Sequence, residues 1–356
     1  SRRRHTRCLS DWSSDVCSSD LLRSSTCSRR TRRTKESQHE NVSLACWNHT
    51  GRVRSHAGSA GEAGKERARP DWAFVTPDKD QPANAEGTGP NRIPGSDKSY
   101  TFAQIEDLSH PPDWFPNDHG QLPRAVSGEG LSIRACGSCH LMSGEGHPES
   151  AGLAGMPVEY LVRQMADFKS GARNNAGMTA IAKSLSDADT LAAAEYFAAL
   201  KPGRWVRVVE AQTVAKSYVT NPGRRRLPRA EGGTEPLDNR IVELPEDAHR
   251  AMSHDPRSGF AAYVPPDSVA KGKELVMNGG KGKTIACTIC HGDELKGIGA
   301  VPRLAGLHPL YVARQLSQFQ TDAYSGTAPA LMKKVVSNLD ENDMLEIAAY
   351  LASLAP

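Results

Sequence analysis

The motif Cys-x-x-Cys-His occurs twice in this chain, as Cys136–His140 and Cys287–His291. Both copies lie in segments that repeat each other at an offset of 151 residues. The same offset aligns Leu153-Ala154-Gly155 with Leu304-Ala305-Gly306, Tyr160 with Tyr311, Arg163-Gln164 with Arg314-Gln315, and Phe168 with Phe319. After a three-residue insertion the offset becomes 154, and it aligns Met178 with Met332, Tyr196 with Tyr350 and Pro202 with Pro356. A sequence that repeats in this way encodes one structural unit twice, so we predict two copies of one small domain.

Each motif has the chemistry of covalent haem attachment. The two thiols of Cys-x-x-Cys-His form thioethers with the vinyl groups of haem, and the adjacent histidine ligates the iron. We therefore predict two covalently bound haem c groups, attached through Cys136, Cys139, Cys287 and Cys290, with His140 and His291 as proximal iron ligands.

Two other uses of paired cysteines stay open. A thioredoxin-like dithiol has the same spacing, but it is placed at the start of a helix that follows a strand. Both pairs here are followed by histidine and a glycine-rich stretch. A pair of zinc sites would also use cysteine and histidine, and it would give a colourless protein. The remaining cysteines have spacings that match no metal site: Cys8, Cys17, Cys27 and Cys46.

A second axial ligand completes a six-coordinate haem, and a methionine thioether in that position raises the redox potential. Met178 and Met332 are the methionines that align with each other, 38 and 41 residues beyond their proximal histidines. We predict that both are distal ligands, in a loop before the last helix of each copy. Bis-histidine ligation stays open, although none of the other candidate histidines recurs in both copies: His110, His119, His147, His249, His254 and His308.

Helices can be placed inside each copy. Apolar residues recur at three- and four-residue spacing in residues 157–169 and 308–320, which predicts amphipathic helices. The patterns Ser186-x-x-Asp189 and Asp340-x-x-Asp343 are typical of capping boxes and mark the start of a last helix. Residues 268–277 predict a helix before the second motif, in which Gly272 allows another helix to approach closely.

The rest of the chain predicts extended segments around the two domains. Residues 70–121 are rich in Pro, Asp, Asn and Gly with isolated aromatics, and we expect them to pack on the first domain. Residues 203–266 are too long for a plain linker, and residues 205–209 and 240–244 predict short strands within them. The predicted fold class is mainly α, with domains at residues 122–202 and 267–356 joined by this connector.

Residues 1–69 lack helical or strand periodicity and are rich in Ser, Arg and Gly, which predicts a disordered tail. Residues 1 to about 22 also resemble translated sequencing-adapter sequence, so we expect the tail to be spurious and the true export signal to be missing. The tail carries fifteen Lys and Arg against seven Asp and Glu. Because the formal net charge of the whole chain is only +3, the rest of the chain carries a net negative charge. Few aromatics accompany the basic residues, which disfavours nucleic-acid binding. No apolar run is long enough to predict a transmembrane segment.

The two copies resemble class I cytochrome c domains of the tandem dihaem bacterial kind. The residues that carry the resemblance are the two Cys-x-x-Cys-His motifs, the Leu-Ala-Gly loops, the Tyr-x-x-x-Gln helices and the aligned methionines. In such domains the carbonyl of a proline soon after the motif accepts a hydrogen bond from Nδ1 of the proximal histidine. Pro302 fits that role, but Ala151 stands at the aligned position of the first copy, so the partner of His140 stays open.

Two haems with both axial positions filled by protein leave no open site for a substrate. We therefore predict an electron-transfer protein and not an enzyme, located in the periplasm, with a dehydrogenase as donor and an oxidase or another cytochrome as acceptor. One alternative is a permanent cytochrome subunit of a dehydrogenase or oxidase complex. The other is a dihaem peroxidase, which needs a haem with a vacant or displaceable ligand.

Overall fold

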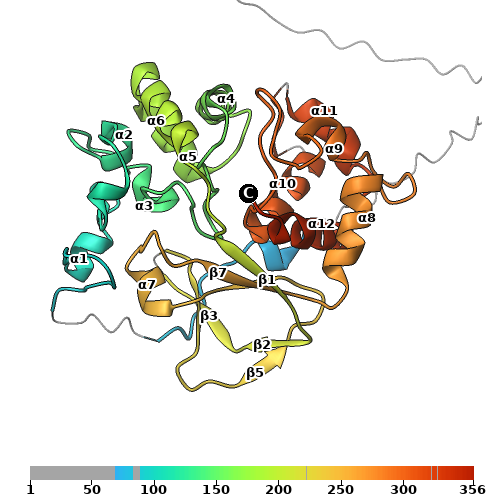
Figure 1. The fold of residues 1–356 in the computed structure, drawn as a ribbon, viewed down its shortest axis with the longest axis horizontal. Coiled ribbons are helices and arrows are strands. Elements are labelled where there is room, and N and C mark those ends of the chain that lie inside the picture. Colours follow the sequence, from blue (N-terminus) through green and yellow to red (C-terminus); the bar gives the residue numbers. More distant parts are fainter. Residues whose placement is uncertain (1–68, 83–88, 222, 322, 327) are drawn as a thin grey trace, which may run out of the picture. The chain divides into compact units, whose positions relative to one another are not determined.

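The computed structural model describes residues 69–82, 89–221, 223–321, 323–326 and 328–356. The described part is mostly α-helical and has a small β region, which lies below two groups of helices in Figure 1. This agrees with the predicted fold class. The tail predicted over residues 1–69 lies outside the described residues except for Arg69.

The first repeat contains five helices: α2 (Arg124–Ser127), α3 (Gly137–His140), α4 (Val158–Ser170), α5 (Ala176–Ser184) and α6 (Asp187–Ala199). Helices α4 and α6 lie near their predicted places. Helix α4 buries Leu161 and Phe168, which lie on one face because they are seven residues apart. It ends at Gly171, which adopts the left-handed conformation common after helices. Helix α6 begins where the Ser186 hydroxyl accepts a hydrogen bond from the Asp189 amide, as the sequence predicts.

The second repeat has the same order of helices: α8 (Ser268–Asn278), α9 (Thr288–His291), α10 (Pro309–Gln320), α11 (Pro329–Val336) and α12 (Glu341–Ser353). The capping box of Asp340 and Asp343 is complete, with each side chain accepting from the other's backbone amide. Helices α8 and α12 cross at Gly272, where an added Cβ would lie 1.9 Å from the carbonyl oxygen of Glu346. The predicted close approach at Gly272 is thus confirmed.

The prediction that both methionines lie in loops is wrong. Met178 is the third residue of α5, and Met332 is the fourth residue of α11. Asn175 caps the start of α5, and its side chain accepts a hydrogen bond from the Met178 amide, so the cap itself holds Met178 in the first turn. Helix α11 begins with Pro329, whose fixed backbone angle suits that position.

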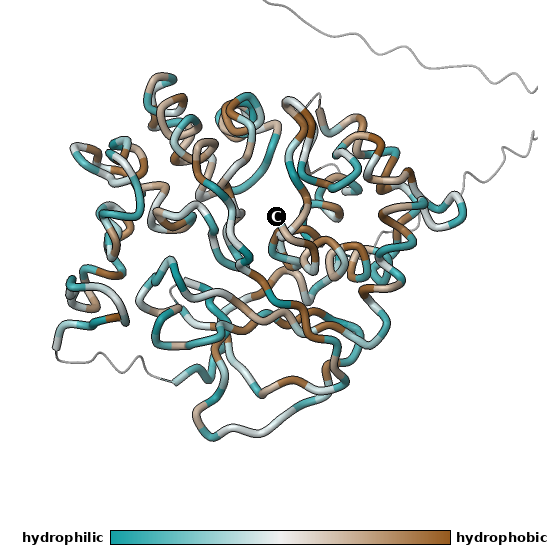
Figure 2. The backbone as a smooth tube through the Cα atoms, in the orientation of Figure 1, coloured by the Kyte–Doolittle hydropathy of each residue, from teal (hydrophilic) through white to brown (hydrophobic). Residues whose placement is uncertain are grey.

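The connector forms a three-stranded sheet and two antiparallel pairs of short strands. Strands β1 (Val206–Glu210), β7 (Phe260–Val264) and β6 (Val242–Pro245) form the sheet, with β1 parallel and β6 antiparallel to β7. Strand β2 (Thr213–Ala215) pairs with β5 (Thr234–Pro236), β3 (Ser217–Val219) pairs with β4 (Arg226–Pro228), and α7 (Ala248–Met252) precedes β7. The two predicted strands correspond to β1 and β6. Figure 2 shows apolar and polar residues alternating along the helices of both repeats, which is typical of helices that bury one face.

Where the structure describes it, the segment before the first repeat has little regular structure: a 3-10 helix (Asp71–Ala73), α1 (Phe102–Ile105) and a second 3-10 helix (Pro116–Asp118). Its aromatic residues form a small core of their own, in which Trp114 packs with Phe115 and Tyr100. The indole of Trp114 donates a hydrogen bond to the Ser253 carbonyl in the connector. The segment therefore has an anchor in the connector.

Candidate haem sites

The proximal histidine of each repeat stands at the end of a one-turn helix built by its own motif. Helix α3 presents His140 and α9 presents His291, and each side chain is 8% exposed. His140 Nδ1 donates to the Ala151 carbonyl oxygen at 2.7 Å, and His291 Nδ1 donates to the Pro302 carbonyl oxygen at 2.8 Å. Because Nδ1 carries the proton in both rings, Nε2 keeps the lone pair that binds a metal.

Ala151 resolves the open question about the first copy. The hydrogen bond uses the main-chain carbonyl, which every residue has, so alanine at this position accepts as well as Pro302 does in the second copy. The two rings are therefore oriented in the same way despite the different side chains.

Burial sets the protonation of the motif residues. It lowers the pKa of His140 and His291, which keeps both imidazoles neutral. Burial raises the pKa of Cys136 to about 12 and that of Cys287 to about 11. Thiols that stay protonated lack the nucleophilic thiolate of a redox dithiol, and neither motif helix follows a strand. The thioredoxin-like alternative is disfavoured on both grounds.

A zinc site is disfavoured by the arrangement of the same residues. A structural zinc ion takes four nitrogen, sulfur or oxygen ligands from the protein. In the part of the chain that the structure describes, no three His, Cys, Asp or Glu side chains gather in a group suited to a metal ion. Each motif instead offers one imidazole nitrogen, which suits haem iron.

The helix that carries each methionine lies beside the chain leading into the motif. In the second repeat, the Thr284 hydroxyl donates to the Val335 carbonyl of α11 at 2.6 Å. In the first, a Cβ on Gly177 of α5 would lie 4.0 Å from a guanidinium nitrogen of Arg134. Met178 and Met332 are both half-buried. They hold corresponding places in the two repeats, as their alignment predicts.

Several of the other candidate histidines have protein partners. His308 is buried, and its Nδ1 donates to the Glu243 carboxylate at 2.6 Å. His254 lies against the Arg225 guanidinium. His110 and His119 each contact an aspartate, at 3.2 Å. These contacts support structural roles and make them poor candidates for distal ligands.

Sequence reasoning missed the contacts that join the repeats. Arg173 donates to the side-chain carbonyl oxygens of Gln164 in the first repeat and Gln315 in the second, both at 2.6 Å. The two glutamines are aligned with each other by the 151-residue offset. The repeats therefore meet through corresponding helices, α4 and α10. The sequence signal for this contact is that Gln164 and Gln315 stand at aligned positions of the two repeats.

A family model described as cytochrome c matches residues 269–355. Cytochrome c-554(547) of Halothiobacillus neapolitanus is 32% identical over 84 residues, which cover 92% of that protein and 20% of this chain. The chain belongs to the cytochrome c family. The resemblance predicted from the motifs is confirmed at this level, and membership implies covalently bound haem c.

Two further relatives match over longer stretches. The thiosulfate dehydrogenase electron acceptor of Thiomonas intermedia is 28% identical over 225 residues, covering 62% of this chain and 78% of that protein. A cytochrome c4 of Pseudomonas aeruginosa is 26% identical over 224 residues, covering 62% of this chain and 83% of that protein. None of the helices in the described part of the chain has the length and apolar character needed to span a bilayer.

Proposed function

We propose that this protein is a dihaem electron carrier of the bacterial periplasm. The observation that carries the proposal is the pair of buried imidazoles, His140 and His291, each oriented by a carbonyl 11 residues further along the chain. Such an orientation is typical of a metal-ligating histidine. It occurs once in each repeat, which supports a count of two haems.

The four motif cysteines would hold the haems, and Met178 and Met332 would be the distal ligands. The haem supplies the one-electron chemistry when bound. The protein holds Nε2 of each histidine unprotonated and buries the imidazole, and the methionine thioethers would supply the second ligands. Two filled axial positions favour transfer of electrons over binding of a reactant.

Electron transfer without catalysis is confirmed as the general function, because relatives named as an electron acceptor or as cytochrome c4 match most of their own length. For this chain we propose domains at residues 122–202 and 267–356, with the connector at residues 203–266. We propose a dehydrogenase as electron donor and an oxidase or another cytochrome as acceptor.

The test is to produce the protein in cells that attach haem c and to titrate its redox state. We expect two covalently bound haems for each chain, low-spin spectra and two one-electron steps. Fewer than two haems, or a high-spin signal from either one, would contradict the proposal. Peroxide turnover by the reduced protein would favour the dihaem peroxidase.

The axial methionines can be tested one at a time. In Met332→Ala we expect the second haem to stay attached but to become high-spin or to fall in potential, because sulfur stabilises Fe(II). Met178→Ala should do the same to the first haem. Met344→Ala is the matched control, since Met344 is buried in the core of α12 and aligns with Thr190. An unchanged spectrum and potential in Met332→Ala would remove that residue from the site.

A second candidate is a cytochrome subunit held permanently by one dehydrogenase. It is favoured by the relatives named for accepting electrons from thiosulfate dehydrogenase, in Thiomonas intermedia and Stutzerimonas stutzeri. Purification of the mature protein from its natural source separates the two. A free carrier elutes alone, whereas a subunit elutes with its dehydrogenase.

A further inference from the structure

A cavity of about 360 Å³ lies beside the first haem-attachment motif. It is lined by the segment before the first repeat (residues 112–119), by the motif and the turn after it (residues 137–145), and by residues of the connector. Neither cysteine of the motif lines it, and neither does His140 or Met178. Pockets that bind small molecules have volumes of about 300–1,000 Å³. The cavity is therefore large enough for a small ligand and separate from the candidate haem site.

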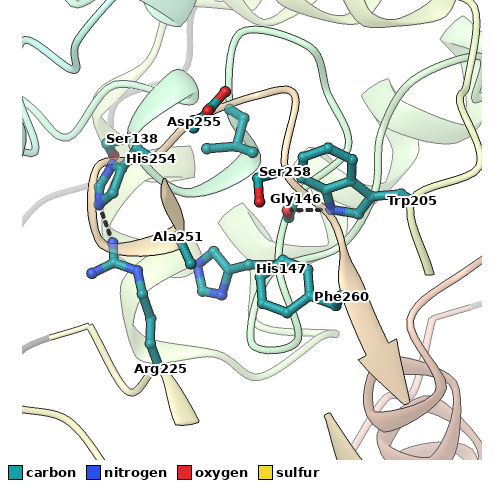
Figure 3. A pocket seen from close by; sticks show the side chains of 11 residues that line it. Ser138, Gly146, His147, Trp205, Arg225, Ala251, His254, Asp255, Ser258 and Phe260 are labelled. Atoms are coloured by element: carbon teal, nitrogen blue, oxygen red, sulfur yellow. Dashed lines mark hydrogen bonds between the residues drawn. The ribbon is translucent and has the colours of Figure 1, made fainter. Parts of the chain in front are cut away.

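The cavity has apolar walls, formed by five buried side chains: Trp114, Phe115, Leu141, Met142 and Trp205. Two of the aromatic walls are fixed by hydrogen bonds. The Trp114 indole donates to the Ser253 carbonyl at 2.7 Å, and the Trp205 indole donates to the Gly146 carbonyl at 3.1 Å (Figure 3). Rigid aromatic walls of this kind suit a planar apolar ring.

Charged side chains of both signs also line the cavity, and four of them form pairs. The Arg257 guanidinium donates to the Asp118 carboxylate at 2.7 and 2.9 Å. His119 Nε2 lies 3.2 Å from a carboxylate oxygen of Asp113. Because these groups are engaged with each other, they do not call for a ligand of either charge.

Two further charged residues of the lining have opposite signs. Lys201 is exposed, whereas Glu145 is buried and accepts a hydrogen bond from the Gly203 amide at 2.5 Å. Burial raises the pKa of Glu145, which favours its uncharged form. An anionic ligand would meet the carboxyl groups of the lining, and a cationic ligand would meet Lys201 and Arg257. An uncharged ligand fits best.

Two buried polar atoms without a protein partner belong to residues that line the cavity: His254 Nδ1 and Ser143 Oγ. In the part of the chain that the structure describes, five side-chain nitrogen or oxygen atoms are buried in this state. A buried polar atom that makes no hydrogen bond is costly, so each such atom asks for an explanation. Two of them at one cavity indicate a ligand that completes their hydrogen bonds.

The contacts of His254 define what its free nitrogen offers. Nε2 contacts the Arg225 guanidinium, which has donors only (Figure 3). Burial and the charge of Arg225 lower the pKa of His254 well below 6.5, so the ring is neutral. A neutral ring whose Nε2 accepts carries its proton on Nδ1. His254 therefore offers an N–H donor, and the Ser143 hydroxyl offers both a donor and an acceptor.

We propose that this cavity binds a small uncharged aromatic molecule that carries a carbonyl oxygen and a hydroxyl group. The carbonyl oxygen accepts from His254 Nδ1, the hydroxyl group bonds to Ser143, and the ring lies against the apolar walls. Leu141 and Met142 follow His140 directly, so the ligand lies next to the first motif. The site is an addition to the proposed electron transfer and does not depend on it.

The test measures the binding of two ligands to the mature protein by calorimetry. One is para-hydroxyacetophenone, and the other is para-ethylphenol, which has a methylene group in place of the carbonyl. We expect the ketone to bind with a dissociation constant below about 1 mM. It should bind about fivefold more tightly than para-ethylphenol, which corresponds to one hydrogen bond.

Two variants remove the two unpartnered atoms. His254→Phe keeps a ring but has no N–H group, so the preference for the ketone should disappear, as in a double-mutant cycle between protein and ligand. Ser143→Ala should weaken both ligands about twofold or more, because both have the hydroxyl group. His110→Phe is the matched control, since His110 is exposed and does not line the cavity. It should leave both affinities unchanged.

The neighbouring cavity supplies the competing explanation. It has a volume of about 20 Å³, enough for about one water molecule, and His254 lines it as well. If His254→Phe kept the preference for the ketone, Nδ1 would be assigned to that water and the proposal would be overturned. If His254→Phe did not fold, unchanged affinities in Ser143→Ala would overturn it.

Two results with the unmodified protein would also overturn the proposal. One is that neither ligand binds to a sample that contains two haems, a result that leaves the proposed function intact. The other is that para-hydroxybenzoate binds more tightly than the ketone, because the site would then select an anion. Fewer than two haems in a sample that binds the ketone would instead contradict the proposed function alone.

Discussion

Gly272 is the point where helices α8 and α12 come closest, and its replacement by alanine gives a sharp test of the packing of the second repeat. The new Cβ would lie 1.9 Å from the Glu346 carbonyl oxygen and 2.8 Å from Cβ of Tyr350. The Glu346 oxygen belongs to the backbone and the Tyr350 Cβ is fixed to it, so neither atom can move aside by a change of side-chain rotamer. The helices would have to separate by about 1.5 Å to restore ordinary contact distances.

The expected cost follows from two opposing effects. Overpacking of this kind costs about 1–3 kcal/mol, and backbone contact places Gly272→Ala at the upper end. The higher helix propensity of alanine offsets about 1 kcal/mol of this cost. The net loss in the free energy of unfolding should therefore be about 2 kcal/mol, shared between a wider α8–α12 interface and poorer packing of buried neighbours such as Leu275 and Leu351.

The assay is equilibrium denaturant unfolding of the mature protein, followed by circular dichroism. Gly177→Ala is the matched control because Gly177 also lies inside a helix, and its added Cβ would come no closer than 3.5 Å to any neighbour. That variant should gain about 0.5 kcal/mol from propensity. If Gly272→Ala proved as stable as Gly177→Ala, the close crossing of α8 and α12 would be refuted.

Two further predictions concern buried and capping carboxylates. Glu243 accepts from His308 Nδ1 at 2.6 Å and from the Leu310 amide at 2.8 Å with no exposure to solvent. Glu243→Ala should cost about 3–5 kcal/mol in denaturant unfolding, and a loss below about 1 kcal/mol would mean that these bonds do not anchor β6 to α10. Burial opposes ionisation of Asp340, but hydrogen bonds from Lys283 and the Asp343 amide outweigh it and lower its pKa below 3.8. Asp340→Ala should therefore cost about 1 kcal/mol at neutral pH. The difference from the unmodified protein should shrink as the pH falls below 3.8 and through the pKa of the folded state, and a pH-independent difference would contradict the role of the charge.

Much of the local structure of this protein follows from its sequence. The repeat predicts two like units, the spacing of apolar residues predicts α4 and α10, and the capping patterns predict where α6 and α12 begin. These features depend on residues within a few positions of one another, and short-range sterics and hydrogen bonds suffice to specify them. The Cys-x-x-Cys-His motif belongs to the same class, because its five residues carry the chemistry themselves.

Other features depend on residues far apart in the chain, and only the tertiary structure decided them. Glu243 meets His308 across 65 residues, and Trp205 reaches Gly146 across 59. The hydrogen bond from His140 to the Ala151 carbonyl could not be predicted either, because every residue has a main-chain carbonyl and the sequence does not mark which one accepts. Ser138 in the first motif is 3% exposed, whereas Ile289 at the aligned position of the second motif is 70% exposed, although the two motifs share one pattern. That asymmetry arises from long-range packing, which local patterns do not encode.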